Sequence, residues 1–255
     1  MKNDLTINPV QETKKIVSFL RKTFKKQNIF HAVLGLSGGI DSATSLFLLS
    51  KALPVENIHV FHIPYFLEDT SLIEHILQKA NIPQKNLHII SIKEPTDALK
   101  GTLKIEKDQI IRLGNIMARI RMITLFDFAK KMNALVVGTE NKSEYHLAYF
   151  TRFGDEASDI EPIQHLYKTQ IIQLAQYLQV PQFVIDAKPT AGLWEGQTDE
   201  SEFGFTYEQA DQVMYLYFDK KQSLATVKKQ FPHAEKIISW CKKNDFKHHV
   251  PYRIQ

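Results

Sequence analysis

The chain has 255 residues, of which 44% are hydrophobic and 24% are charged, and its formal net charge is +4. This is the composition of an ordinary globular protein, long enough to bury the core of one α/β domain over residues 1–255. No apolar run has the length of a transmembrane span, and the N-terminus lacks the apolar segment of a secretory signal. The single cysteine, Cys241, excludes an intramolecular disulfide, so we expect a cytoplasmic protein that binds no membrane.

Strands and helices are predicted to alternate along the chain. Asn8-Pro9 has the pattern of an N-cap followed by a first-turn proline, and it predicts a helix that runs to about Lys26. The elements expected after it are strand 32–36, helix 43–53, strand 57–63, helix 68–81, strand 86–92, helix 109–132 and strand 134–137. This alternation predicts a parallel sheet flanked by helices. The C-terminal part is predicted to be helical over residues 207–217, 223–230 and 234–243.

A glycine-rich turn separates the first predicted strand from its helix. It reads GLSGGIDS, residues 35–42. Gly38 and Gly39 allow the backbone to approach a ligand closely, and the N–H groups that open the next helix point at an anion. Asp41 lies where other phosphate-binding loops carry a lysine. Because a carboxylate repels phosphates unless a cation bridges them, the loop predicts Mg²⁺.

The predicted helix 109–132 is apolar nearly all round. Such a helix is buried on more than one side, either at the core of a monomer or between the sheet and a second subunit. We expect the second arrangement and therefore a homodimer. Arg119 and Arg121 would be costly in this setting unless each found an anion.

Polar residues follow the strand predicted at 134–137. Ligands of parallel sheets bind at the carboxyl ends of the strands, so Thr139 and Glu144 are expected close to the glycine turn. Thr139 could simply cap the next helix and Glu144 could simply favour its dipole. A second carboxylate near Asp41, however, is what a Mg²⁺ ion with phosphates requires.

Two long polar segments read as loops that close over a site, residues 151–159 and 190–204. Trp194 in the second loop is too large to be left without a role. Between the loops, Lys168 opens a predicted helix, where its charge opposes the helix dipole and so indicates another purpose.

Four stretches occur in an order and spacing typical of one family: GLSGGIDS, GTENKSE, YFTRFGDEASDIEPI with its continuation LYKTQ, and PTAGLWEGQTDE. Together they resemble the bacterial ammonia-dependent NAD synthetases, which belong to the N-type ATP pyrophosphatases. The resemblance spans about residues 30–215. It implies the adenine nucleotide alpha hydrolase-like fold with a PP-loop, here residues 35–42.

The resemblance also implies site residues. The matching ATP-binding positions are Gly35, Leu36, Ser37, Gly38, Gly39, Ile40, Asp41, Ser42, Thr139, Lys168 and Thr190. Those for deamido-NAD are Arg119, Arg152, Asp159 and Lys247. Asp41 and Glu144 would hold Mg²⁺, and Asp41 and Lys168 would be catalytic.

Three positions depart from the family pattern. Arg152 stands where many relatives have lysine, and residues 156–157 are Glu-Ala where Gly-Gly is usual. At the C-terminus Phe246 replaces the histidine of a His-Lys pair, so only Lys247 is carried over.

The implied reaction converts deamido-NAD, ATP and ammonia into NAD, AMP and pyrophosphate. Asp155 and Asp159 are both candidates for the base that deprotonates ammonium. We expect free ammonia rather than glutamine, because the resemblance begins too near Met1 for a glutaminase domain and Cys241 has no partnered base. Two alternative functions remain for a chain with this loop: a tRNA-modifying adenylating enzyme, and a non-catalytic nucleotide-binding protein.

The positive charge gathers at the end of the chain, where residues 220–255 carry nine Lys or Arg against Glu235 and Asp245. With little aromatic interleaving, this is more typical of a solvated helix face than of a nucleic-acid surface. We expect no nucleic-acid partner; the tail could also close over an anionic small molecule.

Overall fold

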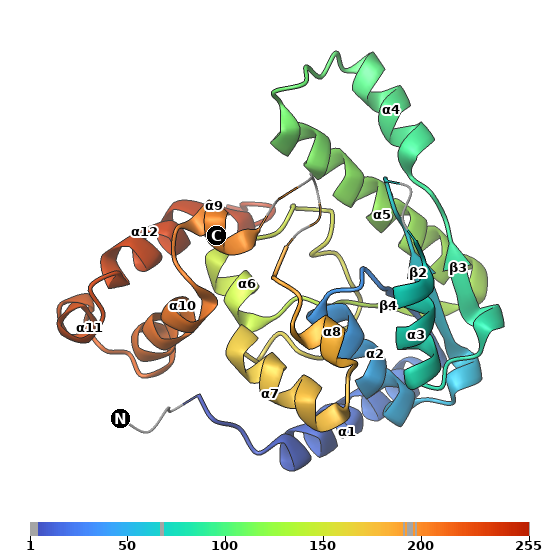
Figure 1. Ribbon diagram of the computed structural model, residues 1–255, viewed down its shortest axis with the longest axis horizontal. Helices are drawn as coiled ribbons and strands as arrows, with labels where there is room; N and C mark the ends of the chain where they lie inside the picture. The colour runs from blue at the N-terminus through green and yellow to red at the C-terminus, as the bar shows by residue number, and fades with distance from the viewer. Residues whose placement is uncertain (1–4, 67–68, 191, 193–195, 197, 255) are drawn as a thin grey trace.

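The computed structural model describes residues 5–66, 69–190, 192, 196 and 198–254. Its centre is a four-stranded parallel sheet with the strand order β3-β2-β1-β4 (Figure 1). The strands are β1 (His31–Gly35), β2 (Ile58–His62), β3 (Leu87–Ile89) and β4 (Ala134–Val137). β1 is central, and its residues Ala32 to Leu34 are all buried, as expected for a parallel sheet that is covered on both faces.

Helices cover both faces of the sheet. Alternate side chains of β1 point to opposite faces, so Leu34 and Val33 belong to different cores. Leu34 packs in the core formed with α1 (Pro9–Gln27), α2 (Ile40–Ala52), α3 (Ser71–Lys79), α7 (Lys168–Leu178) and α8 (Gln182–Ile185). Val33 faces the long helix α5 (Ile110–Met132), whose Met117 and Ile120 are buried against this side.

The C-terminal helices form a separate core beside the sheet (Figure 1). Tyr167, Phe203 and Met214 are among its fully buried side chains. The helices are α6 (Lys142–Leu147), α9 (Asp199–Phe203), α10 (Tyr207–Met214), α11 (Leu224–Gln230) and α12 (Ala234–Asn244). The predicted fold class, a helix-flanked parallel sheet with a helical C-terminal part, is confirmed.

Several predicted boundaries are wrong. β3 ends at Ile89, because the following residues make only single bonds to the neighbouring segment, such as Ile92 N to Pro64 O at 3.0 Å. A helix that was not predicted, α4 (Lys93–Thr102), comes next. It has a proline in its first turn and a glycine near its end, where both residues are tolerated but depress the helix signal.

The loop predicted at residues 190–204 contains α9, and Trp194 lies outside the described residues. The predicted start of the helix at Glu68 also lies outside them, and α3 begins at Ser71. The helix predicted to end at residue 217 leaves α-helical geometry after Met214 and continues as a π-helical turn, Tyr215–Asp219. Within the described part of the chain, none of the helices is both long and apolar enough to cross a membrane.

Candidate active site

The glycine-rich turn leaves the first turn of α2 open to an anion. Gly38 has φ +90°, a conformation that side chains other than glycine rarely adopt. Gly39 is the N-cap of α2 and supplies no side-chain acceptor for the first N–H groups of the helix. Ser42 Oγ instead accepts from Ser37 N at 3.3 Å and donates to Gly39 O at 3.0 Å, which holds the turn in shape. The turn that was predicted to bind phosphate is therefore a formed structure, and α2 has no side-chain cap.

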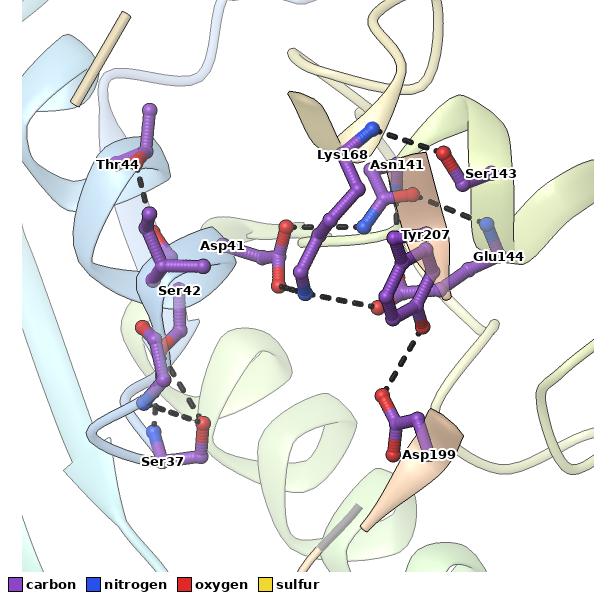
Figure 2. A network of polar contacts seen from close by, with 12 residues as sticks. Ser37, Asp41, Ser42, Thr44, Asn141, Ser143, Glu144, Lys168, Asp199 and Tyr207 are labelled. Atoms are coloured by element: carbon purple, nitrogen blue, oxygen red, sulfur yellow. Dashed lines mark hydrogen bonds and ion pairs between the residues drawn. The ribbon is translucent and has the colours of Figure 1, made fainter. Parts of the chain in front are cut away.

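Asp41, Glu144 and Lys168 meet at the carboxyl edge of the sheet (Figure 2). Lys168 Nζ lies 2.5 Å from Asp41 Oδ2 and 3.6 Å from Glu144 Oε1. Asp41 and Glu144 lie in the first turns of α2 and α6, which follow the parallel strands β1 and β4 and so begin at the same edge of the sheet. Lys168 opens α7, which in the described chain follows no strand directly and is tied to α6 by the bonds Lys142 N to Leu166 O and Lys168 N to Ser143 Oγ, both 2.8 Å. The structure thus brings together the three charged residues that the sequence singled out on separate segments.

Asn141 joins the two acids, and the sequence analysis missed it. Its side-chain amide donates to Asp41 Oδ1 at 2.9 Å, while its own Oδ1 accepts from Glu144 N at 3.0 Å (Figure 2). In the opposite direction, Asn141 N donates to Glu144 Oε2 at 3.2 Å. The two bonds together form a capping box at the start of α6. The signal was available, since Asn followed three residues later by Glu is the pattern of such a box.

A buried serine–aspartate pair holds the backbone of Lys168. Ser143 Oγ accepts from Lys168 N at 2.8 Å and donates to Asp211 Oδ1 at 2.5 Å. Asp211 Oδ2 also accepts from Thr169 N at 2.9 Å, so α10 is tied to the start of α7. Burial raises the pKa of Asp211 to about 6, although its hydrogen bonds oppose that shift. Nothing local in the sequence marks Asp211, because its role exists only across this contact.

The buried charges of this cluster influence one another. Lys168 is only 4% exposed, and burial alone would lower its pKa. The negative charges of Asp41 and Glu144 outweigh that effect and raise its pKa above the ordinary value. Burial and the charge of Asp41 also raise the pKa of Glu144. The ammonium of Lys168 therefore occupies a position where two carboxylates favour a cation.

The aromatic ring of Tyr207 also contacts the ammonium of Lys168. Lys168 Nζ lies 5.2 Å from the ring centroid of Tyr207, within the range of a cation–π contact. Tyr207 Oη donates to Asp199 Oδ2 at 3.0 Å (Figure 2). Asp199 opens α9, so the described end of the motif PTAGLWEGQTDE reaches the lysine through Tyr207.

The remaining ATP-binding positions lie at the ends of the surrounding segments. Thr139 is half-buried and follows β4, directly before the capping box of α6. Thr190 is exposed, and its Oγ1 accepts from Gly192 N at 3.1 Å. Among the described residues, neither threonine is a hydrogen-bond partner of the Asp41 or Lys168 side chain.

Among the residues expected to bind deamido-NAD, Arg119 and Arg152 contact each other, whereas Asp159 is bound to the sheet. Arg119 is exposed on α5, and its Nε donates to the main-chain oxygen of Arg152 at 3.2 Å. Asp159 Oδ2 accepts from Val136 N on β4 at 2.8 Å. Lys247 Nζ donates to two main-chain oxygens, those of Ala148 and Phe150.

Arg119 and Arg121 of α5 were expected to need anions, and in the structure each of them donates to a main-chain carbonyl. Arg121 Nε donates to Ile63 O at 3.0 Å, as Arg119 does to Arg152 O. Arg119 is exposed and Arg121 is partly exposed, so neither guanidinium is fully removed from water.

A helix-flanked parallel sheet that carries this glycine loop, followed by an acid and facing a lysine, defines a nucleotide-binding protein of the PP-loop class. The family model for NAD synthase matches residues 12–251. The NH(3)-dependent NAD(+) synthetase of Fusobacterium nucleatum is 41% identical, over 98% of this chain and 97% of its own length. The chain therefore belongs to the NAD synthase family.

Solved structures agree with this assignment. The chain matches the NMN synthetase from Francisella tularensis with a TM-score of 0.83 and 32% identity, over 98% of this chain and 100% of the other. It matches the NH3-dependent NAD synthetase from Campylobacter jejuni with a TM-score of 0.79 and 30% identity, over the same shares.

Proposed function

We propose that this protein is an ammonia-dependent NAD synthetase, which uses ATP to convert the carboxylate of deamido-NAD into the amide of NAD. The observation that carries the proposal is the convergence of Asp41, Glu144 and Lys168 beside an open phosphate loop. Membership of the NAD synthase family and 41% identity to an enzyme of that name support it.

The chemistry explains why such a site is needed. Ammonia does not displace an oxide from a carboxylate, so the carboxylate must first attack the α-phosphorus of ATP and expel pyrophosphate. Ammonia then attacks the resulting acyl adenylate, and AMP leaves. Negative charge develops on phosphate oxygens in the first step, and the N–H groups of α2 and the ammonium of Lys168 would stabilise it. The protein forms no covalent intermediate with its own side chains in this scheme.

We propose that Asp41 and Glu144 hold a Mg²⁺ ion. Their carboxylates already converge on one cation, the ammonium of Lys168, so a divalent ion bound to phosphate fits the same donors. None of the described residues forms a cluster of three or more potential metal ligands, which fits an ion that takes its other ligands from ATP and water. The ion would neutralise the phosphate oxygens, and Lys168 would then be free to turn toward them.

ATP contacts are proposed for residues 35–42, Thr139, Lys168 and Thr190. Deamido-NAD is proposed to lie against Arg119, Arg152, Asp159 and Lys247. The ammonium of Lys247 donates to the carbonyls of Ala148 and Phe150, close to Arg152 in the chain. Asp155 and Asp159 both stay candidates for the base. Asp155 is exposed, and its Oδ1 accepts from Thr151 N at 2.9 Å, whereas Asp159 is bound to β4.

A second candidate function follows from the structural comparison. The relative from Francisella tularensis is an NMN synthetase, which differs by name in the nucleotide that it makes. The same adenylation and amidation could act on nicotinate mononucleotide, because the carboxylate that reacts is the same.

One assay separates these functions. Purified protein is incubated with ATP, Mg²⁺ and ammonium, and with either deamido-NAD or nicotinate mononucleotide, while AMP and the amide product are quantified. AMP and NAD in equal amounts, formed faster from deamido-NAD, support the proposal. Faster amidation of the mononucleotide would assign the second function, and no amide from either acid would exclude both.

We also propose a homodimer formed through α5. Ile111 and Ile123 on this helix are 65% and 60% exposed, and Leu103 after α4 is 50% exposed. We infer that a second subunit covers these apolar side chains, which lie on α5 and on the turn before it. We further propose that residues 1–255 act as one domain in the cytoplasm, where the buried thiol of Cys241 stays reduced.

A further inference from the structure

The chain segment of residues 148–153, which carries Arg152, is held from two sides. Ala148 and Phe153, at its two ends, have φ +49° and +57°, values that cost energy for residues other than glycine. On one side, α5 contacts the segment: Arg119 Nε donates to Arg152 O, and Thr151 Oγ1 donates to Asn115 Oδ1 at 2.8 Å.

The other side is held by a C-terminal 3-10 turn, η4 (Asp245–His248). Lys247 Nζ donates to the carbonyl oxygens of Ala148 and Phe150, each at 2.8 Å. The ring of His248 lies 5.4 Å from that of Phe150. Lys247 therefore binds the backbone of the segment, and His248 packs against the side chain of Phe150.

Phe246, the second residue of the turn, contacts Arg152 itself. The guanidinium carbon of Arg152 lies 5.2 Å from the ring centroid of Phe246, within cation–π range. No carboxylate among the described residues forms an ion pair with Arg152. The aromatic ring is thus a contact that orients the guanidinium while leaving its N–H donors available to an anion.

We propose that the turn of Phe246, Lys247 and His248 is a clamp, and that Phe246 is a positioning residue for Arg152. The inference rests on the proposed function, in which Arg152 contacts the nicotinate-containing nucleotide. Lys247 and His248 fix the strained segment, and Phe246 selects the direction of the guanidinium. Preorganising this long side chain lowers the entropy lost when the nucleotide binds. The ligand class that such an arginine recognises is a phosphate or carboxylate of that nucleotide.

Phe246→Ala tests the clamp. The variant should raise the KM of the better nucleotide acid ~3- to 5-fold, the effect of losing one partly exposed cation–π contact. The kcat and the KM of ATP should stay at wild-type values, and Phe246→Tyr should restore the KM. Tyr252→Ala, which removes an aromatic side chain that is 73% exposed near the same terminus, should change nothing.

A double-mutant cycle shows whether Phe246 acts through Arg152. In an Arg152→Ala background, Phe246→Ala should cause no further rise in KM. An equal rise in that background, an unchanged KM in the single variant, or a parallel rise in the KM of ATP would overturn the proposal.

Amide hydrogen exchange over residues 148–153 gives a readout without turnover. Exchange there should be faster in Lys247→Met, which removes the two bonds to Ala148 O and Phe150 O, and unchanged over β1. Unaltered exchange would refute the clamp whatever the activity, whereas a wild type that amidates neither acid would refute only the proposed function.

Discussion

Replacing Lys168 by methionine is the sharpest test of the charge cluster. The lysine is 4% exposed and its ammonium lies 2.5 Å from Asp41, so the substitution leaves two buried carboxylates without their cation. Breaking a buried ion pair in this way typically costs about 3–5 kcal/mol. For a protein of this size each kcal/mol lowers the Tm by roughly 2–4 °C, which predicts a loss of roughly 6–20 °C.

Catalysis should suffer separately from stability. If the ammonium stabilises charge on the departing pyrophosphate, kcat should fall by about 10²–10³ while the KM of deamido-NAD changes little. Millimolar Mg²⁺ without ATP should raise the Tm of the variant more than that of the wild type, because the ion can take the vacated position between Asp41 and Glu144.

Thermal denaturation and steady-state kinetics measure these effects, with Lys142→Met as a matched control. Lys142 pairs with Asp219 at 2.6 Å, but both side chains are partly exposed, so its loss should cost about 1 kcal/mol or less and leave kcat unchanged. An unchanged kcat in Lys168→Met, with only the KM of deamido-NAD raised, would show that the lysine serves the other substrate.

Four further predictions concern other parts of the molecule. Asp41→Asn should keep the fold at a lower Tm, because it removes one of the two carboxylates that pair with the buried Lys168, and it should lower kcat by about 10²–10³; near-normal turnover at saturating Mg²⁺ would show that the metal lies elsewhere. Ile123→Asp should yield a monomer by light scattering, whereas a monomeric wild type at micromolar concentration would rule out the proposed dimer. Burial lowers the pKa of His146 to about 4, so unfolding takes up a proton and stability should fall by about 3 kcal/mol from pH 6.5 to 4, a slope that His146→Phe should flatten in denaturant titrations. Burial raises the pKa of Cys241 to about 12, so Cys241→Ala should keep full activity and glutamine should not replace ammonia; glutamine-driven synthesis in ammonia-free reagents would contradict this.

The sequence by itself determined the class of fold and the chemistry of the loop. Alternating strand and helix patterns specify a parallel sheet because they reflect local backbone preference and one-dimensional periodicity. The turn at residues 35–42 was identified for the same reason, since Gly38 and the start of α2 are neighbours along the chain. Lys168 could be singled out because a positive charge at a helix start is unfavourable locally.

The tertiary structure alone decided which of these groups meet. Asp41 and Lys168 are 127 positions apart, and Asn141 is 100 positions from Asp41, so no local pattern encodes their hydrogen bonds. Asp211 has no sequence signal at all, because a buried aspartate is stable there only through donors that α7 and Ser143 bring to it.

The long helix α5 shows the same division. Its apolar residues on every side predicted burial on more than one face, and Met117 is indeed buried against the sheet. Only the packing of the sheet decided that Ile111 and Ile123 would be left exposed. Helical periodicity states which residues share a face, whereas the choice of the face that is covered depends on elements distant in the chain.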